Sequence, residues 1–198
     1  MNKKFGWLIG LLALVLLIGG ASVLYHRMSG EAALPPVAAP AETPTEAETT
    51  EEETVEPVAA PDFTVFDGDG NAVQMSDYLG TPVIINFWAS WCSPCQREMP
   101  DFDAAFQQYG EEIQFMMVNL TDGSRETVDT AKTFMEESGY TFPVFFDTAY
   151  SAAIAYGVSS IPATYFINAE GNLVAYGIGP LNMEALETGI GMMKNPAE

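Results

Sequence analysis

The sequence predicts a three-layer α/β domain with a central mixed β-sheet over residues 61–198. Apolar runs of strand length alternate with stretches of helical pattern, which is typical of parallel strands joined by helical crossovers. The last two apolar runs are instead joined by the short turn Glu170-Gly171-Asn172, which favours an antiparallel hairpin. This part of the chain is about the size of one ordinary domain and is rich enough in apolar residues to form its own core.

The elements follow from local patterns along this domain. Residues 62–80 predict an N-terminal β-hairpin, because Asp67-Gly68-Asp69-Gly70 is a strong turn signal. Residues 82–90 form a continuous apolar run, as expected for a buried central strand. The other expected elements, in chain order, are a helix over residues 94–109, a strand over 113–120, a helix over 126–138, a strand over 142–146, a short helix over 149–156, strands over 163–168 and 173–178, and a last helix over 183–193.

The amino terminus carries a predicted membrane segment. Residues 5–25 contain no charged residue, and as a helix of roughly 31 Å they could cross a bilayer core of about 30 Å. Lys3 and Lys4 precede this run, which favours an N-terminus in the cytoplasm and the domain over residues 61–198 outside it. Residues 1–28 are therefore expected to form a single-pass anchor in the cell membrane. A cleaved signal peptide is the alternative, because small residues occupy positions 19–22, and it would also export the domain.

Residues 29–60 are predicted to be a disordered acidic linker. The segment consists mainly of Ala, Pro, Thr and Glu, with eight glutamates and no basic or aromatic residue. Such a composition cannot bury enough apolar surface to offset the entropy lost on ordering. The linker would let the domain move near the membrane without leaving it.

Charge and histidine content exclude several classes of function. The chain has 27 acidic and seven basic residues and a formal net charge of −20, so it should repel phosphate backbones, and nucleic acid is not an expected partner. The only histidine, His26, lies outside the domain. Catalytic Cys-His dyads and Ser-His-Asp triads are therefore excluded there.

Both cysteines, Cys92 and Cys95, lie in the stretch NFWASWCSPCQREMP, residues 86–100. A closed zinc site usually needs four Cys or His ligands, and the domain offers two thiols and no imidazole. A purely structural disulfide over so short a loop would restrict the unfolded chain little. A redox-active pair explains more of the surrounding sequence than either of these interpretations.

The redox interpretation rests on where the cysteines fall in the predicted elements. Cys92 follows the predicted central strand and precedes a helix that begins near Pro94, a residue suited to a first helical position. Unpaired N–H groups and the positive end of the dipole at a helix N-terminus stabilise a thiolate and lower the thiol pKa. Cys92 is therefore the expected nucleophile. Cys95, one turn further, is the expected resolving cysteine that closes the disulfide.

The same stretch resembles the active-site segment of the thioredoxin fold, and in detail that of membrane-anchored thiol-disulfide oxidoreductases of the TlpA and ResA type. The matching features are Trp88 and Trp91 before the first cysteine, the Cys-Xaa-Pro-Cys core and Pro100 after it. The later segment YGVSSIPATYFINAEGNLV resembles the family segment in which Pro162 is the cis-proline facing the disulfide. The resemblance implies a thioredoxin-like, redoxin (AhpC/TSA-like) domain with an N-terminal β-hairpin and a family-type insertion near residues 121–156.

The resemblance also gives a role to Glu98. Spacing alone leaves two options for a residue three positions after Cys95: a solvated helix residue, or a carboxylate that leans toward the cysteine. In ResA-type proteins the glutamate at this position assists the active-site thiols, which implies a catalytic role for Glu98. Plain thioredoxin has a buried aspartate six residues before the first cysteine, where this chain has Asn86, which cannot take a proton.

Four further residues are expected to contact substrate or support the site: Trp91, Pro94, Ile161 and Pro162. Trp91 is the better candidate for a surface contact beside the sulfur, and Trp88 for core packing. Arg97 is the only cation expected near the cysteines. The redox-active disulfide is expected to suffice without a bound cofactor or metal.

The predicted function is thiol-disulfide exchange outside the cytoplasm, in the direction that reduces protein disulfides. Expected partners are disulfide-bearing extracytoplasmic proteins, apocytochrome c among them, and a membrane-embedded thiol electron donor, which the anchor and the resemblance suggest. One alternative is a peroxiredoxin-like peroxidase. Such enzymes usually carry Thr or Ser three residues before the reactive cysteine and Pro seven residues before it, where this chain has Ala89 and Ile85. The other alternative is a non-catalytic binding module, which would need no reactive thiol.

Overall fold

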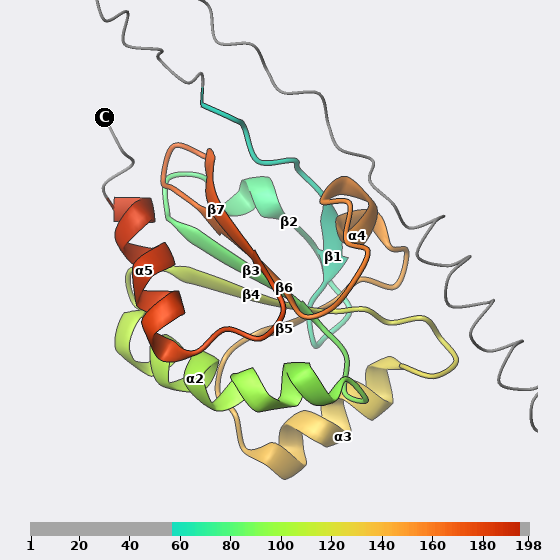
Figure 1. Ribbon diagram of the computed structural model, residues 1–198. Coiled ribbons are helices and arrows are strands. Elements are labelled where there is room, and N and C mark those ends of the chain that lie inside the picture. Colours follow the sequence, from blue (N-terminus) through green and yellow to red (C-terminus); the bar gives the residue numbers. More distant parts are fainter. Residues whose placement is uncertain (1–56, 195–198) are drawn as a thin grey trace, which may run out of the picture. The chain divides into compact units, whose positions relative to one another are not determined.

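The architecture is a seven-stranded mixed β-sheet covered by helices on both faces (Figure 1). The structure is a computed structural model that describes residues 57–194. The strand order is β2-β1-β5-β4-β3-β6-β7. The strands are β1 (Thr64–Phe66), β2 (Ala72–Gln74), β3 (Val83–Trp88), β4 (Gln114–Asn119), β5 (Val144–Phe146), β6 (Ala163–Ile167) and β7 (Leu173–Ile178).

Strand β3 is the central strand that the continuous apolar run predicted. All six of its residues are buried, because helices cover the sheet on both sides. It pairs in parallel with β4 and antiparallel with β6. Since the active-site segment begins directly after β3, the most buried strand of the sheet anchors the site.

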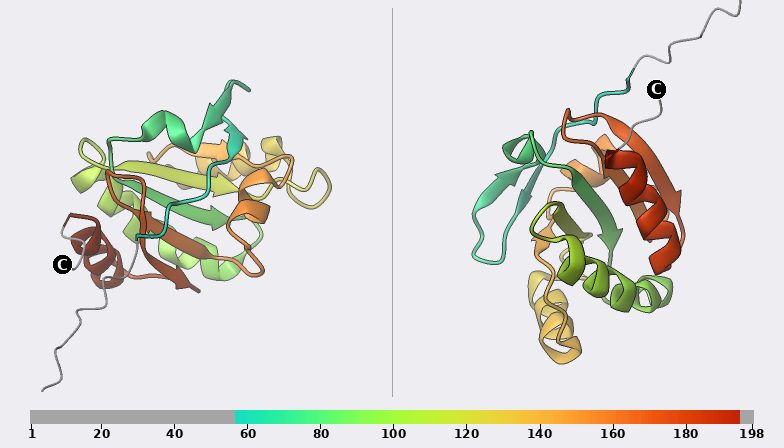
Figure 2. Two further views of the ribbon diagram at one scale, coloured as in Figure 1. Left: turned by 90° about the horizontal axis from the view of Figure 1, so that it is seen from above. Right: turned by 90° about the vertical axis from the view of Figure 1, so that its left-hand side faces the viewer.

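The helices divide between the two faces of the sheet. Helices α2 (Ser93–Tyr109), α3 (Val128–Ser138) and α5 (Met183–Lys194) pack with one buried cluster, which includes Trp88, Phe102 and Phe166. Helix α4 (Ser151–Ala155) and the 3₁₀ helix η1 (Met75–Tyr78) pack with a second cluster on the other face. Figures 1 and 2 show this arrangement, with α2 and α3 on one side of the sheet and α4 on the other. The predicted three-layer fold is confirmed.

The predicted hairpin and the predicted insertion both contribute to one half of the sheet. Strands β1 and β2 pair antiparallel around the turn at residues 67–70. Between β4 and β6 the chain adds α3, β5 and α4, and β5 lies between β4 and β1. It pairs in parallel with β4 and antiparallel with β1. The insertion therefore joins the N-terminal hairpin to the central strands.

Helix α3 begins two residues later than residue 126, where the sequence placed its start. Thr127 is the N-cap residue, and its hydroxyl oxygen accepts a hydrogen bond from the Thr130 N–H at 3.1 Å. Glu126 therefore precedes the helix, and its side chain is fully buried. The 3₁₀ helix η1 was not predicted, because it is a single short turn within the segment that reads as a hairpin.

Contacts with the sheet also begin slightly before residue 61, the predicted boundary. Ala59 forms an isolated antiparallel bridge with Asn172, and the Ala60 N–H donates to the Gly171 carbonyl oxygen at 2.9 Å. The predicted anchor over residues 1–28 and the linker up to residue 56 lie outside the described residues. Within residues 57–194, no helix has the length and apolar character that crossing a membrane requires.

Candidate active site

Cys92 and Cys95 form a disulfide at the start of α2. Their sulfur atoms are 2.08 Å apart and their Cα atoms 5.2 Å apart. Cys92 is the N-cap residue of the helix, and its Sγ accepts a hydrogen bond from the Cys95 N–H at 3.3 Å. In the reduced protein the same N–H and the helix dipole would stabilise a Cys92 thiolate.

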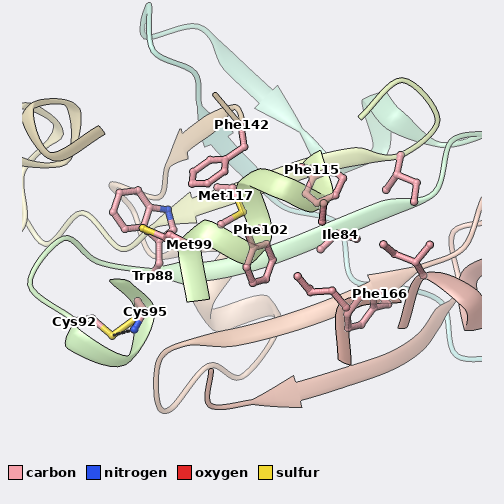
Figure 3. Close-up of a cluster of buried hydrophobic side chains, with 14 of the residues drawn as sticks. Ile84, Trp88, Cys92, Cys95, Met99, Phe102, Phe115, Met117, Phe142 and Phe166 are labelled. Carbon is pink, nitrogen blue, oxygen red and sulfur yellow. Dashed lines mark hydrogen bonds between the residues drawn. A yellow bond between two sulfur atoms is a disulfide. The ribbon is translucent and has the colours of Figure 1, made fainter. Parts of the chain in front are cut away.

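The two cysteines differ slightly in accessibility. Cys92 keeps 4% of its surface exposed, whereas Cys95 is completely buried. Figure 3 shows the pair at one end of the large buried cluster, next to Trp88. An attacking thiol from another protein can therefore reach Cys92 first, which agrees with the predicted division of roles.

The predicted supporting residues lie around this disulfide. Pro94 occupies the first turn of α2, where its missing N–H leaves no hydrogen bond unmade. The Ile161 carbonyl oxygen lies 3.9 Å from the Cys92 Sγ, and the Ile161-Pro162 peptide bond is cis, as the resemblance implied. Trp91 is 42% exposed, while Trp88 is buried, so their predicted placement is confirmed.

Glu98 is buried inside the apolar face of α2, only 1% exposed. Its Oε1 accepts a hydrogen bond from the Asn86 Nδ2 at 2.8 Å, and its Oε2 accepts one from the Leu181 N–H at 2.9 Å. Asn86 comes from β3, and Leu181 from the segment between β7 and α5. The solvated-helix interpretation of Glu98 is therefore wrong.

Burial changes the acidity of this carboxyl group. Removal from water raises the pKa of Glu98 to about 7, and the hydrogen bonds from Leu181 and Asn86 only partly offset that rise. The group can therefore both take up and release a proton near neutral pH. It lies three positions, just under one helical turn, after Cys95 on α2.

Asn86 is placed to respond to the protonation state of Glu98. Its Nδ2 also donates to the Thr164 hydroxyl oxygen at 3.0 Å, while its buried Oδ1 finds no hydrogen-bond partner within residues 57–194. A protonated Glu98 needs an acceptor for its O–H, and an amide turned by 180° would present Oδ1 to it. Strand β3 thus supplies a neutral amide, and the titratable carboxyl group comes from α2.

Sequence reasoning missed a second buried carboxylate at this site. Glu126 is fully buried. It accepts hydrogen bonds from the Ser90 N–H at 2.8 Å, the Ser90 hydroxyl at 2.6 Å and the Asn119 Nδ2 at 2.6 Å. Its only sequence signal is its position at the end of a polar run after β4, which is typical of a loop rather than of a site.

Besides Arg97, a second cation contacts the active-site segment, which the sequence did not predict. Arg97 donates to the hydroxyl oxygen of Ser93, between the two cysteines, at 3.2 Å. The Arg125 guanidinium lies 3.7 Å from the centre of the Trp91 ring, directly beside Cys92 in sequence. The contact between Arg125 and Trp91 could not be predicted from local spacing, because the insertion after β4 brings together residues that are far apart in the sequence.

The fold and the site together define a thioredoxin-like thiol-disulfide oxidoreductase. The AhpC/TSA family matches this sequence over residues 58–176. The thiol-disulfide oxidoreductase ResA of Bacillus thuringiensis is 34% identical over 128 residues, which cover 65% of this chain and 72% of that protein. The chain therefore belongs to the AhpC/TSA family.

Solved structures agree with this assignment. A putative thiol:disulfide interchange protein DsbE from Chlorobium tepidum superposes with a TM-score of 0.62 at 30% identity, covering 70% of this chain and 97% of that one. StoA from Bacillus subtilis superposes with a TM-score of 0.58 at 25% identity, covering 68% of this chain and 99% of that one. These likenesses span the domain that carries the Cys92–Cys95 disulfide.

Proposed function

We propose that this protein reduces disulfides of other proteins outside the cytoplasm, with Cys92 as the nucleophile and Cys95 as the resolving cysteine. The observation that carries the proposal is the position of the disulfide, with Cys92, which keeps 4% of its surface exposed, as the N-cap residue of α2 and the fully buried Cys95 behind it. Glu98, a buried carboxyl group with a pKa of about 7 on the same helix, adds a proton donor and acceptor.

Two exchange steps complete the reaction. The Cys92 thiolate attacks one sulfur of the substrate disulfide, so that a mixed disulfide forms and the first substrate sulfur leaves as a thiolate. The Cys95 thiol loses its proton and attacks the Cys92 sulfur, which breaks the mixed disulfide and releases the second substrate sulfur. The protein disulfide forms as two electrons pass to the substrate.

Glu98 serves the buried sulfur in these steps. As a carboxylate it takes the proton that Cys95 must lose before it attacks. When a donor thiol later reopens the Cys92–Cys95 disulfide, Cys95 leaves as a thiolate, and protonated Glu98 returns the proton. Asn86 accommodates both states, since its amide offers a donor or an acceptor.

The proposed location and partners rest on the sequence. Residues 5–25 and the lysines before them support a single-pass membrane anchor with the domain outside the cytoplasm. Disulfide-bearing extracytoplasmic proteins are the proposed substrates, apocytochrome c among them. A membrane-embedded thiol donor would return the protein to its dithiol form, because oxidised substrates alone cannot regenerate it.

Single-cysteine variants test the assignment of the two sulfur atoms. Cys92→Ser should abolish disulfide reduction, because the remaining thiol is buried. Cys95→Ser should trap substrates on Cys92, because no resolving thiol remains. The trapped species can be identified by mass spectrometry after non-reducing electrophoresis of cells that express the variant. Trapping by Cys92→Ser but not by Cys95→Ser would show that the two roles are reversed.

A further inference from the structure

Two loops meet beside the disulfide and contact each other at consecutive residues. The active-site loop, residues 89–92, joins β3 to α2, and the β4–α3 loop, residues 120–127, joins β4 to α3. Glu126 of the second loop binds Ser90 of the first, and the neighbouring Arg125 lies over Trp91. The contact therefore involves the two residues that precede Cys92.

Glu126 is held so that its carboxylate is directed at Ser90. Of its three donors, two come from Ser90 and one from Asn119. The Asn119 side chain is itself oriented by the Thr121 hydroxyl, which donates to its Oδ1 at 2.9 Å. A fully buried carboxylate needs such donors, and charge-assisted hydrogen bonds are stronger and more directional than neutral ones.

Ser90 uses all of its polar groups in holding the active-site loop. Its N–H and hydroxyl donate to Glu126, and its carbonyl oxygen accepts a hydrogen bond from the Gln96 side chain. The loop is closed by the Cys92 N–H, which donates to the Ala89 carbonyl oxygen at 3.1 Å. The turn that carries Trp91 and Cys92 is thus fixed from the insertion on one side and from α2 on the other.

Trp91 is fixed by the same pair of loops. The Arg125 guanidinium covers one face of its ring in a cation–π contact, yet the side chain remains 42% exposed. The ring borders a shallow hollow of about 360 Å³ that Phe134 and Thr133 of α3 also line. A protein substrate that approaches Cys92 would meet this surface.

We propose that Glu126 is a positioning residue for thiol-disulfide exchange, which acts through Ser90 to hold Trp91 and Cys92 in the geometry that a protein substrate requires. The inference rests on the proposed function and adds a residue outside the Cys92–Cys95 helix to it. Freeing the loop would have opposite effects on two reactions. A small reagent would reach the Cys92 thiolate more easily, whereas a protein disulfide would meet a misplaced docking surface and react more slowly.

Ser90→Ala and Glu126→Gln in the full-length chain test this. Ser90→Ala removes the hydrogen bond from the Ser90 hydroxyl to Glu126 without changing the charge. Glu126→Gln replaces one carboxylate oxygen with an NH₂ group, which cannot accept the hydrogen bonds that Ser90 and Asn119 donate. We expect each reduced variant to reduce insulin disulfides on the order of tenfold more slowly than wild type, because small displacements of a reacting group are costly. We expect iodoacetamide to alkylate Cys92 severalfold faster at equal thiolate fraction. The double variant should be no slower than the slower single variant, because both changes break one contact.

Asp147→Asn is the matched control. Asp147 is also a fully buried carboxylate, but its side chain accepts a hydrogen bond from the Ala153 N–H at the start of α4 and makes none with the active-site loop or Glu126. It should leave both rates within twofold of wild type. Rates equally unchanged in Ser90→Ala would overturn the proposal, and so would alkylation slowed in parallel with insulin reduction. Alkylation needs no protein substrate, so a wild-type chain that failed to reduce insulin would count against the proposed function, while faster alkylation of Ser90→Ala would still support the positioning role.

Discussion

At the scale of single residues, the main feature of the site is the buried carboxyl group of Glu98, three positions after Cys95 on α2. Asn86 in β3 pairs with Thr164 in β6, and the hydrogen bond between their side chains fixes the Asn86 amide on the side of the sheet that α2 covers. Glu98 then meets that amide from the helix. The site therefore keeps a titratable group although the central strand has none at position 86.

The raised pKa of Glu98 predicts a pH dependence of stability. Since the folded state holds the proton more tightly than the unfolded state, the contribution of Glu98 to the free energy of unfolding falls as pH rises from its ordinary value of 4.5 through about 7. The full effect is roughly 3 kcal/mol. Glu98→Gln should remove this slope, as measured by urea unfolding between these pH values.

A carboxylate on the surface provides the control for this prediction. Glu112 forms an exposed ion pair with Lys194 at 2.9 Å, and such pairs contribute little to stability. Glu112→Gln should change the free energy of unfolding by less than about 0.5 kcal/mol at any pH in this range. If wild type and Glu98→Gln lose stability in parallel as pH rises, Glu98 does not carry the buried proton.

The pH dependence of exchange should follow the same residue. Wild-type disulfide reduction should show an inflection near pH 7, where Glu98 changes from acid to carboxylate. Glu98→Gln should lose that inflection and keep only the inflection of the Cys92 thiol. Single-turnover reduction of insulin across this pH range measures it, and a profile identical to wild type would remove Glu98 from the proton transfer.

At the scale of elements, the contact between α5 and the sheet depends on a glycine. A Cβ at Gly189 would lie 2.4 Å from the ring of Phe166 in β6, whereas nothing lies within 4 Å of a Cβ at Gly191 two positions further along the helix. Helix α5 can therefore approach β6 closely only where residue 189 has no side chain.

Alanine at these two positions should have opposite effects. Gly189→Ala should lower the free energy of unfolding by about 1–3 kcal/mol, because it overpacks the core. Gly191→Ala should raise it by about 0.5–1 kcal/mol, because alanine favours the helix more than glycine does. Chemical denaturation of the two variants gives both values. Equal effects of the two substitutions would mean that α5 does not lie this close to Phe166.

The elements themselves could largely be predicted, because each depends on local pattern. The apolar run of β3, the turn at residues 67–70 and the hairpin of β6 and β7 are all properties of neighbouring residues. The burial of Glu98 was also open to detection, since Cys95, Met99 and Phe102 place it inside the apolar stripe of α2.

The contacts of Arg125 and Glu126 could not be predicted in this way. They depend on how the β4–α3 loop returns to the active-site loop, more than thirty positions earlier in sequence. A glutamate just before a helix is common for its charge alone, so the pattern favoured extending α3 over residue 126. Only the tertiary arrangement shows that the side chain is buried against Ser90.

At the scale of the whole molecule, the balance of charge around the disulfide determines which way electrons flow. Stabilising the thiolate favours the reduced form and makes a couple more oxidising. Arg97 and Arg125 act in that direction from the surface. Two features act in the opposite direction. The chain as a whole carries a net charge of −20. In addition, Glu98 is buried on the same helix as Cys95, and when Glu98 is ionised its negative charge disfavours a thiolate at Cys95.

We therefore expect a reducing couple, with a potential more negative than about −200 mV and far from the value near −120 mV of strong oxidants. Arg97→Gln should make it more negative, because Ser93 between the cysteines then loses its neighbouring cation. Lys132→Gln, which removes a cation that lies over Phe146 rather than beside the disulfide, is the control and should leave the potential unchanged. Equilibration of the protein with glutathione and dithiothreitol buffers, followed by tryptophan fluorescence, measures these potentials. A wild-type value near that of the strong oxidants would mean that the protein introduces disulfides into its substrates, because electrons would then flow from substrate thiols to Cys92 and Cys95.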